Sequence, residues 1–360
     1  MKILLITSAL LSGGTERFLI NFSKVFHKCN EIDVAYYRDS NEDTIGELSQ
    51  FVNNTILLPY YVKHPFEFRR EVLKLYKEGK YDYAYVHANH ALGIMYTFPA
   101  WKKDSATKIL YHSHNSEGNQ KVLQRIYSKK INKVANKRYS CSEGATKYMY
   151  GTNSAYIINN GVDIDRYRYN FEKRKEIREK YGINDKTVYG HIGRFSNQKN
   201  HAFLIDIFSE IVKRDSNSVL FLIGKGENKE ASIQKINSLG LNDKVIFLDS
   251  TSKAGDYYQC FDLFILPSLF EGLPFVGIEA QASGTQCLFS NTITGDIAIT
   301  PLVQFLGLSD TPATWAEKAI EMADKNSPKK DYGEIITQKG FSIYHMISDY
   351  KDSGLDLGEN

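Results

Sequence analysis

The sequence predicts an α/β protein built from two Rossmann-like, doubly wound domains. Its length of 360 residues suits two domains at about 100 to 200 residues each. Its content of 42% hydrophobic and 24% charged residues is typical of a globular chain, which excludes disordered and fibrous proteins. Short apolar runs alternate with helical patterns along the whole chain, as in βαβ units around parallel sheets.

The N-terminal domain is expected over residues 1–165 and opens with a buried strand at 2–7. This apolar run breaks into glycines before a helical pattern, and no small-x-small cleavage site follows, so a strand explains it better than a secretory signal. Further strands, with helices between them, are expected at 32–37, 55–58, 83–87, 108–112, 138–141 and 155–158.

The C-terminal domain is expected over residues 166–338, after a turn-rich segment at 159–167 that leads into a charged helix near 172–181. A helix near 339–351 is expected to pack back toward the N-terminal domain, ahead of a frayed tail at 352–360. The carboxyl ends of both sheets are expected to border an interdomain cleft, where such folds bind ligands. Strands of this domain are expected at 188–192, 219–223, 245–248, 263–266 and 286–290, followed by a helix at 313–324.

The cysteines and the hydropathy indicate a reducing, cytoplasmic location. Four cysteines stand far apart, without the paired spacing of a disulfide framework or a zinc site. No stretch approaches the roughly 18 apolar residues that a membrane-spanning helix requires. Attachment to the inner face of the cell membrane stays open.

The most basic stretch of the chain is residues 121–138. Residues 1–160 hold 22 Lys+Arg against 14 Asp+Glu, although the whole chain carries only +3. Apolar residues recur near helical spacing within the stretch, which predicts an amphipathic helix with a cationic face. Such a helix is either a solvated surface or a binding site for anionic lipids, and no nucleic-acid motif accompanies it. Its cations include Lys121, Arg125, Lys129, Lys130, Lys133 and Lys137.

Two glycine-containing loops at strand ends are candidate anion sites. Gly13 and Gly14 separate the first strand from the first helix, but they lack the dinucleotide and P-loop spacings, and a plain tight turn is the alternative. Gly193 and Arg194 end a strand, and Lys199 follows just before a helix. Two cations on one such loop can bind a shared diphosphate, although surface charge alone would also explain Lys199.

The strongest local signal is a pair of glutamates, Glu271 and Glu279, which bracket a glycine-containing turn that enters a helix. One carboxylate could bind a sugar and the other a ribose diol, because each accepts several hydroxyl hydrogens. Backbone amides at the helix start favour a phosphate. The alternative is a surface glutamate paired with a lysine. The turn between the glutamates contains Gly272, Leu273, Pro274 and Phe275, of which Pro274 offers no N–H.

These motifs in combination resemble those of the retaining GT-B glycosyltransferases of family 4, also described as glycosyl transferases group 1. The resemblance covers nearly the whole chain, and residues 112–115 resemble the version in capsular and exopolysaccharide enzymes. It implies transfer of a sugar from a nucleotide diphosphate sugar, UDP in preference to GDP, to a hydroxyl of a lipid-linked or polymeric saccharide. It also implies retention at the anomeric carbon, with no metal and no other cofactor.

The resemblance also implies roles for individual residues. Arg194 and Lys199 would bind the diphosphate and stabilise the leaving nucleotide. Glu271 would bind the donor sugar and Glu279 the ribose, with the amides of Leu273 and Phe275 nearby. Gly14 would let the first loop close over the phosphates. Both glutamates and both cations would lie at the ligand rather than in the core, so Lys199→Ala and Glu279→Ala are expected to leave the fold intact.

The remaining candidates are two histidines of the first domain and three loop residues of the second. His112 and His114 are expected on one face of a strand end, where at least one contacts the donor sugar, with His114 preferred; a buried structural histidine is the alternative for each. No third ligand with useful spacing is evident, so a metal site is not expected. Gly224, Ser250 and Thr251 follow strands of the second domain and are expected to line the nucleotide pocket.

Two other functions remain open alongside transfer. A sugar-nucleotide epimerase or hydrolase of the same architecture would turn over the donor without an acceptor. A catalytically silent partner subunit would be expected to lose Arg194, Lys199 or Glu279, and all three are present.

Overall fold

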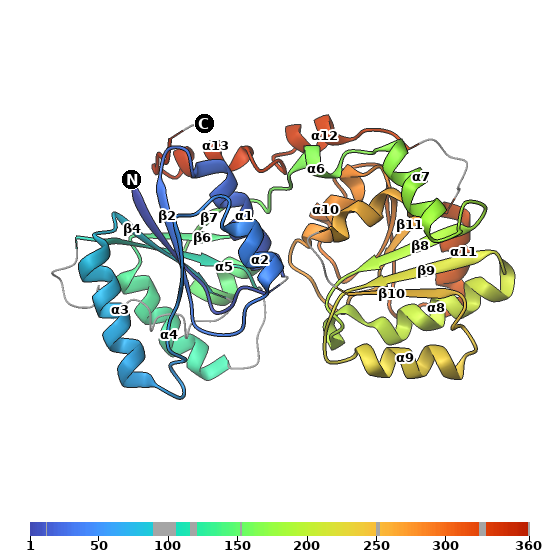
Figure 1. Cartoon of the computed structure of the whole chain (residues 1–360), viewed down its shortest axis with the longest axis horizontal. Coiled ribbons are helices and arrows are strands. Elements are labelled where there is room, and N and C mark those ends of the chain that lie inside the picture. The colour runs from blue at the N-terminus through green and yellow to red at the C-terminus, as the bar shows by residue number, and fades with distance from the viewer. Residues whose placement is uncertain are drawn as a thin grey trace. The chain divides into compact units, whose positions relative to one another are not determined.

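The computed structural model describes residues 1–11, 13–88, 106–115, 121–151, 153–249, 253–323 and 329–358. The chain divides into two compact units (Figure 1). Unit 1 comprises Met1–Gly161 and Ile343–Asn360, and unit 2 comprises Val162–Ser342. The end of the chain therefore returns to the unit in which the chain begins.

Unit 1 is built on a parallel sheet of seven described strands in the order β3-β2-β1-β4-β5-β6-β7. The strand order reverses beside β1, as in a doubly wound sheet, so the α/β prediction is confirmed. The buried apolar residues of β1 and β4 form the centre of the core. The strands are β1 (Lys2–Ile6), β2 (Glu31–Tyr36), β3 (Asn54–Leu57), β4 (Tyr83–Ala88), β5 (Lys108–Ser113), β6 (Lys137–Ser140) and β7 (Tyr156–Ile157).

Helices connect the strands of unit 1. The cationic helix ends at Val134, four residues short of the expected end, because Asn136 pairs with β5: its side chain accepts from the Ile109 amide at 2.6 Å. Lys137 therefore belongs to β6 and not to the helix. The helices of this unit are α1 (Gly14–Phe26), α2 (Glu42–Leu48), α3 (Pro65–Gly79), α4 (Lys121–Val134), α5 (Glu143–Tyr150) and α13 (His345–Asp352).

The expected frayed tail is wrong for the described residues up to Gly358. Leu355 and Leu357 are only 3% and 2% exposed, and the Asn30 side-chain amide donates to the Leu357 carbonyl at 2.7 Å. Before them, Tyr350 of α13 is fully buried, and its hydroxyl lies 2.6 Å from that of Tyr85 on β4. The two leucines, spaced by two residues, anchor this short segment to unit 1. The polar residues around them hide this pattern in the sequence.

Unit 2 is built on a parallel sheet of six described strands in the order β10-β9-β8-β11-β12-β13. β13, at the edge, has no counterpart among the expected strands, because its four half-buried and exposed residues give no continuous apolar run. The strands are β8 (Thr187–Ile192), β9 (Ser218–Ile223), β10 (Val245–Leu248), β11 (Leu263–Leu266), β12 (Gln286–Ser290) and β13 (Val303–Leu306).

The helices of unit 2 cover this sheet and bring the polypeptide back from each strand to the next. Only the second half of the helix expected at 339–351 forms, as α13 in unit 1, and α12 ends just before that range. The remaining helices are α6 (Ile164–Tyr167), α7 (Phe171–Lys180), η2 (Asn197–Lys199), α8 (His201–Arg214), α9 (Lys229–Ser238), η3 (Ala254–Gln259), α10 (Phe275–Ala282), η4 (Gly295–Ile297), α11 (Pro312–Met322) and α12 (Gly333–Gln338).

Candidate active site

The loops that follow β8 and β9 meet at the carboxyl edge of the unit 2 sheet. A Cβ atom on Gly224 would lie 2.0 Å from the Gly193 carbonyl oxygen, so only glycine allows this approach. The Phe195 amide donates to the Lys225 carbonyl at 2.9 Å and holds the two loops together. Gly193 and Gly224, both predicted site residues, therefore lie in contact where the two loops meet.

The turn η2 positions Lys199 beside Glu271. Asn200, which ends the turn, has a left-handed φ of 55°, a conformation that asparagine tolerates. Its side-chain amide donates to the Pro267 carbonyl at 3.2 Å, and the Leu269 amide donates to the Gln198 carbonyl at 2.8 Å. These bonds fasten the β8–α8 loop to the segment that precedes α10.

Lys199 and Glu271 form a tight, shielded ion pair. The Lys199 ammonium lies 2.6 Å from Glu271 Oε1, and the two side chains are 14% and 9% exposed. Ser268 Oγ donates to the same oxygen at 2.9 Å, and Gln198 Nε2 donates to Oε2 at 3.1 Å. Three donors thus fix the carboxylate. The structure brings together one predicted cation and one predicted acid from loops 72 residues apart.

Arg194 has a separate acidic partner. Its guanidinium lies 3.5 Å from Glu227 Oε2, and its side chain is 67% exposed. An exposed pair of this kind contributes little to stability. The guanidinium can therefore leave Glu227 for an anionic ligand at low cost.

Glu279 lies in α10, and its carboxylate is enclosed by two tyrosines. The Tyr167 hydroxyl donates to Oε1 and the Tyr258 hydroxyl to Oε2, both at 2.9 Å, and Glu279 is 7% exposed. Burial, with Glu279 beside it, raises the pKa of Tyr258 well above its ordinary value. Against the expectation that Glu279→Ala spares the fold, these contacts predict that the variant destabilises unit 2, because truncation removes the acceptor of both tyrosine hydroxyls.

The turn between the two glutamates leads into the start of α10. Leu273 and Phe275 are buried, each 7% exposed, while a Cβ on Gly272 would meet no atom within 4 Å. Pro274 is the N-cap residue, and no side chain caps the helix. The amides of the first turn are thus not covered by a capping side chain, as an anion site at this end requires.

Two histidines that the sequence analysis missed lie beneath Lys199. His191 on β8 donates from Nδ1 to the Ile265 carbonyl at 2.8 Å. Its Nε2 is buried and has no hydrogen-bond partner among the described residues. His201 begins α8 and stacks on Phe195 with ring centroids 4.1 Å apart, and no group in the described part of the chain bonds to either of its ring nitrogens. Burial lowers the pKa of His191 to about 4 and that of His201 to about 2. Both rings are therefore neutral near pH 7.

In unit 1, the two predicted histidines belong to a cluster at the carboxyl ends of β4 and β5. His114 Nε2 lies 3.0 Å from Nδ1 of His87, and His112 Nδ1 lies 2.8 Å from the Tyr85 hydroxyl. Phe18 of α1 packs edge-on against His112, with ring centroids 4.6 Å apart. Burial lowers the pKa of all three histidines, that of His114 to about 3.

The third member of this cluster, His87, was not among the residues predicted from the sequence. Ring nitrogens of the three histidines lie within 4.8 Å of one another, close enough in separation for a metal site. The rings of His112 and His114 are stacked, however, with an interplanar angle of 8° and centroids 4.3 Å apart. Stacked rings point their in-plane lone pairs in parallel, whereas tetrahedral coordination requires them to converge. The cluster is thus arranged as a stack of neutral imidazoles.

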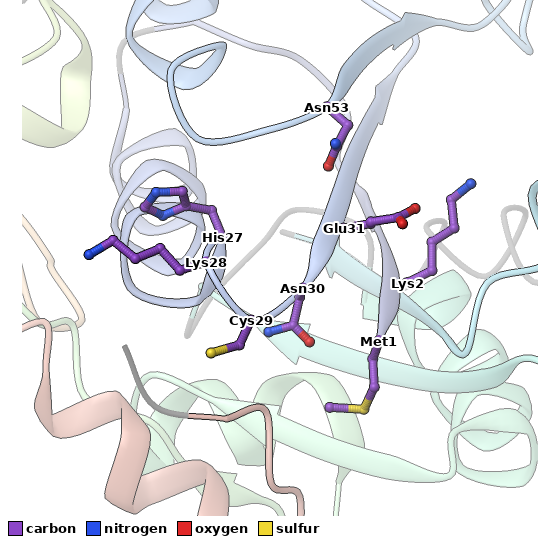
Figure 2. A pocket seen from close by; sticks show the side chains of 8 residues that line it. All are labelled: Met1, Lys2, His27, Lys28, Cys29, Asn30, Glu31 and Asn53. Atoms are coloured by element: carbon purple, nitrogen blue, oxygen red, sulfur yellow. The ribbon is translucent and has the colours of Figure 1, made fainter.

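Other predicted residues have the following places. Gly13 is the N-cap residue of α1 in an extended conformation, and a Cβ there would lie 2.7 Å from the Glu16 carboxylate; Gly14 is the first residue of the helix. Ser250 and Thr251 lie outside the described residues. A pocket at the opposite, amino edge of the unit 1 sheet, lined by Met1, Lys28 and Asn53 among others, contains none of the predicted residues (Figure 2).

The cationic face of α4 consists of Arg125, Lys129, Lys130 and Lys133, all of them exposed. The side chain of Lys121 lies outside the described residues, although its backbone begins the helix. Lys137 has a structural contact instead: its ammonium donates to the Ser353 carbonyl and fastens the C-terminal segment to β6. No helix in the described part of the chain is long and apolar enough to cross a membrane.

Comparison with known proteins assigns most of the chain to glycosyltransferase families. The model of Glycosyltransferase Family 4 matches residues 12–166, and that of Glycosyl transferases group 1 matches residues 173–338. A Bacillus subtilis (strain 168) protein named as the glycosyltransferase EpsF is 27% identical over 96% of this chain and 94% of its own length. The capsular polysaccharide biosynthesis glycosyltransferase CapH of Staphylococcus aureus is 24% identical over 81% of each chain.

Solved structures agree on the fold. The crystal structure of Anabaena Alr3699/HepE in complex with UDP-glucose matches with a TM-score of 0.82, covering 98% of this chain and 99% of that one at 19% identity. Two parallel-sheet units, two consecutive family matches and this structural likeness agree. The chain belongs to the GT-B glycosyltransferases, with a family 4 N-terminal part and a group 1 C-terminal part.

Proposed function

We propose that the protein transfers a sugar from a UDP-sugar, with retention of the anomeric configuration, to a hydroxyl of a lipid-linked or polymeric saccharide. The contact between Lys199 and Glu271 at the carboxyl edge of the unit 2 sheet carries this proposal. The likeness to the glycosyltransferases EpsF and CapH supports the class of reaction, and the UDP-glucose bound to HepE supports the class of donor. The setting is exopolysaccharide assembly at the cytoplasmic side of the membrane.

Lys199 and Arg194 supply positive charge to the diphosphate. Negative charge develops on the departing nucleotide during transfer, and two cations on one loop stabilise it without a metal. Lys199 would exchange Glu271 for a phosphate oxygen, which leaves the carboxylate of Glu271 to accept hydroxyls of the donor sugar. The ion pair of the free protein therefore holds both groups ready for their separate partners.

Glu279 is the proposed ribose acceptor. Each of its oxygens already accepts one tyrosine hydroxyl, and each retains a second acceptor position. The tyrosines fix the carboxylate in one orientation. The proposal also assigns Gly13, Gly14 and Gly224 to the phosphates and nucleotide, Ser250 and Thr251 to the base, and His114, or else His112, to the donor sugar.

Activity assays on single variants test the proposal. Lys199→Ala and Glu271→Gln are each expected to lower transfer from a UDP-sugar by roughly 10² to 10³-fold, because each removes a charge at the reacting group. The matched control is the exposed pair in α8, where Lys213→Ala and Glu210→Gln are expected to keep wild-type activity. The product formed from an α-linked donor should be α-linked when examined by NMR.

Four results would contradict the proposal. Wild-type activity in both site variants would remove these residues from the site. A β-linked product would exclude retention. Donor turnover at an unchanged rate without any acceptor would favour an epimerase or hydrolase, and absence of turnover with every nucleotide sugar would favour a silent subunit.

A further inference from the structure

Two exposed apolar side chains of unit 1 lie close together in the sequence, one in the loop before α3 and one in the first turn of that helix. Phe66, in the first turn of α3, is 88% exposed, and Val62 in the preceding loop is 61% exposed. Phe68, two residues further on, is 1% exposed in the core, so the helix does bury an aromatic residue while leaving Phe66 outside. A large apolar side chain so fully in water is a candidate contact for an apolar partner. We call Val62 and Phe66 the apolar tip.

The apolar tip adjoins cations. Lys63, Arg69 and Arg70 stand beside it in the sequence and are exposed, against one acid, Glu67, in residues 60–70. Arg70 contacts Glu71 at 3.1 Å, but that pair is largely exposed and contributes little. The segment is therefore both apolar and positively charged.

Tyrosines connect this segment to the cationic face of α4. Tyr60, Tyr61 and Tyr127 are half-buried and pack against the same core cluster. Burial is the main cause that raises the pKa of Tyr61, and the neighbouring phenols of Tyr60 and Tyr127 add to it. The Lys130 ammonium lies 5.5 Å from the centre of the Tyr127 ring. Figure 1 shows α3 and α4 in the same part of unit 1.

We propose that the apolar tip inserts into an anionic lipid surface while the cationic face of α4 binds the headgroups. The inference rests on the proposed function, because a lipid-linked acceptor requires the enzyme at a membrane. Charge complementarity selects the occupant: residues 121–138 contain no acid, and anionic lipid attracts such a surface. Half-buried tyrosines suit the interface between headgroups and acyl chains, because the ring is apolar while its hydroxyl can bond to water.

Two signals are needed for such attachment to be stable. Cations alone bind anionic vesicles weakly and lose the attraction as salt screens it, whereas inserted apolar side chains are insensitive to salt. Ile126, which is 50% exposed on α4, adds apolar surface beside the cations. The arrangement thus predicts binding with a salt-sensitive and a salt-resistant part.

Sedimentation of the full chain with vesicles separates these parts. The vesicles contain phosphatidylcholine and phosphatidylglycerol in equal amounts, or phosphatidylcholine alone. The double variant Val62→Ala with Phe66→Ala is expected to bind the mixed vesicles about tenfold more weakly at every salt concentration. The triple variant with Lys129, Lys130 and Lys133 each changed to Gln is expected to lose the difference between the two vesicle types. Phe171→Ala, which removes a 63% exposed phenylalanine from unit 2, is the matched control and should bind like the wild type.

Fluorescence tests insertion directly and guards against a folding defect. Phe66→Trp should be quenched by brominated lipids in mixed vesicles, whereas Phe171→Trp should not. Unchanged binding by the tip variant, or no quenching of Phe66→Trp on bound vesicles, would overturn the proposal, and the latter would favour a protein partner for the tip. Donor turnover by the wild type in solution, without vesicles, is measured separately, so failure of the proposed function would be recognised on its own.

Discussion

Lys199 and Glu271 show how far single residues could be assigned from the sequence. Their motifs placed both at strand ends, and the structure brings them to 2.6 Å. The three buried histidines His87, His191 and His201 were missed, because one polar residue in or beside an apolar run does not reveal its neighbours. The enclosure of Glu279 by two tyrosines was missed for the same reason, since Tyr167 and Glu279 lie 112 residues apart.

The buried histidines predict a stability that falls in acid. Burial lowers the pKa of His201 to about 2, whereas an unfolded chain takes up this proton near pH 6.5. Between these values the unfolded state binds more protons, so the free energy of unfolding decreases as the pH falls below about 6.5. Each such histidine contributes a slope on the order of 1 kcal/mol per pH unit.

The variant His201→Phe isolates one of these contributions. Neither nitrogen of His201 bonds to a described residue, so phenylalanine should fit its place on Phe195 without losing a hydrogen bond. Denaturant titrations at pH 7 and pH 5 should show a smaller loss of unfolding free energy in the variant than in the wild type. Replacement of the exposed His64 by Phe is the control and should leave the loss unchanged. An equal loss in His201→Phe and wild type would refute the assignment.

At the scale of elements, continuous apolar runs predicted the buried strands, whereas short or half-exposed elements were not predicted correctly. β13 presents four residues without a continuous buried run. The helix at α4 was expected to extend through Arg138, because cations continue past its end at Val134. The end at Val134 depends on the pairing of Asn136 with β5, a contact between residues 27 apart that periodicity cannot show. α13 and the segment after it likewise depend on contacts with distant parts of unit 1.

The C-terminal segment should therefore be required for the stability of unit 1. Tyr350→Ala removes a fully buried ring and is expected to cost roughly 3 to 5 kcal/mol of unfolding free energy. Tyr350→Phe, the matched control, loses only the hydroxyl and should cost about 1 kcal/mol, because Tyr85 still bonds to His112. Chemical denaturation followed by circular dichroism measures both. Equal, small effects would show that the segment is attached only loosely.

At the scale of the whole molecule, we propose that the two units contribute differently. The surplus of cations lies in residues 1–160, where α4 and the apolar tip suit a lipid surface, while most of the predicted donor residues, Lys199 and Glu271 among them, lie in unit 2. The sequence predicted this organisation because βαβ alternation and the glycosyltransferase motifs extend over nearly the whole chain. It could not identify the donor sugar, since the hydroxyls of related sugars are distinguished by a few contacts whose positions only the folded pocket determines.

Calorimetric titration with UDP and with UDP-glucose tests the central claim most directly, namely that Lys199 holds the diphosphate and Glu271 the sugar. The wild type and the control Lys213→Ala should bind both ligands. Lys199→Ala should weaken both by roughly tenfold or more, because a charge-assisted contact to phosphate is lost. Glu271→Gln should weaken UDP-glucose and leave UDP nearly unchanged. If neither ligand binds the wild type, or both site variants bind both ligands as the wild type does, the claim is contradicted.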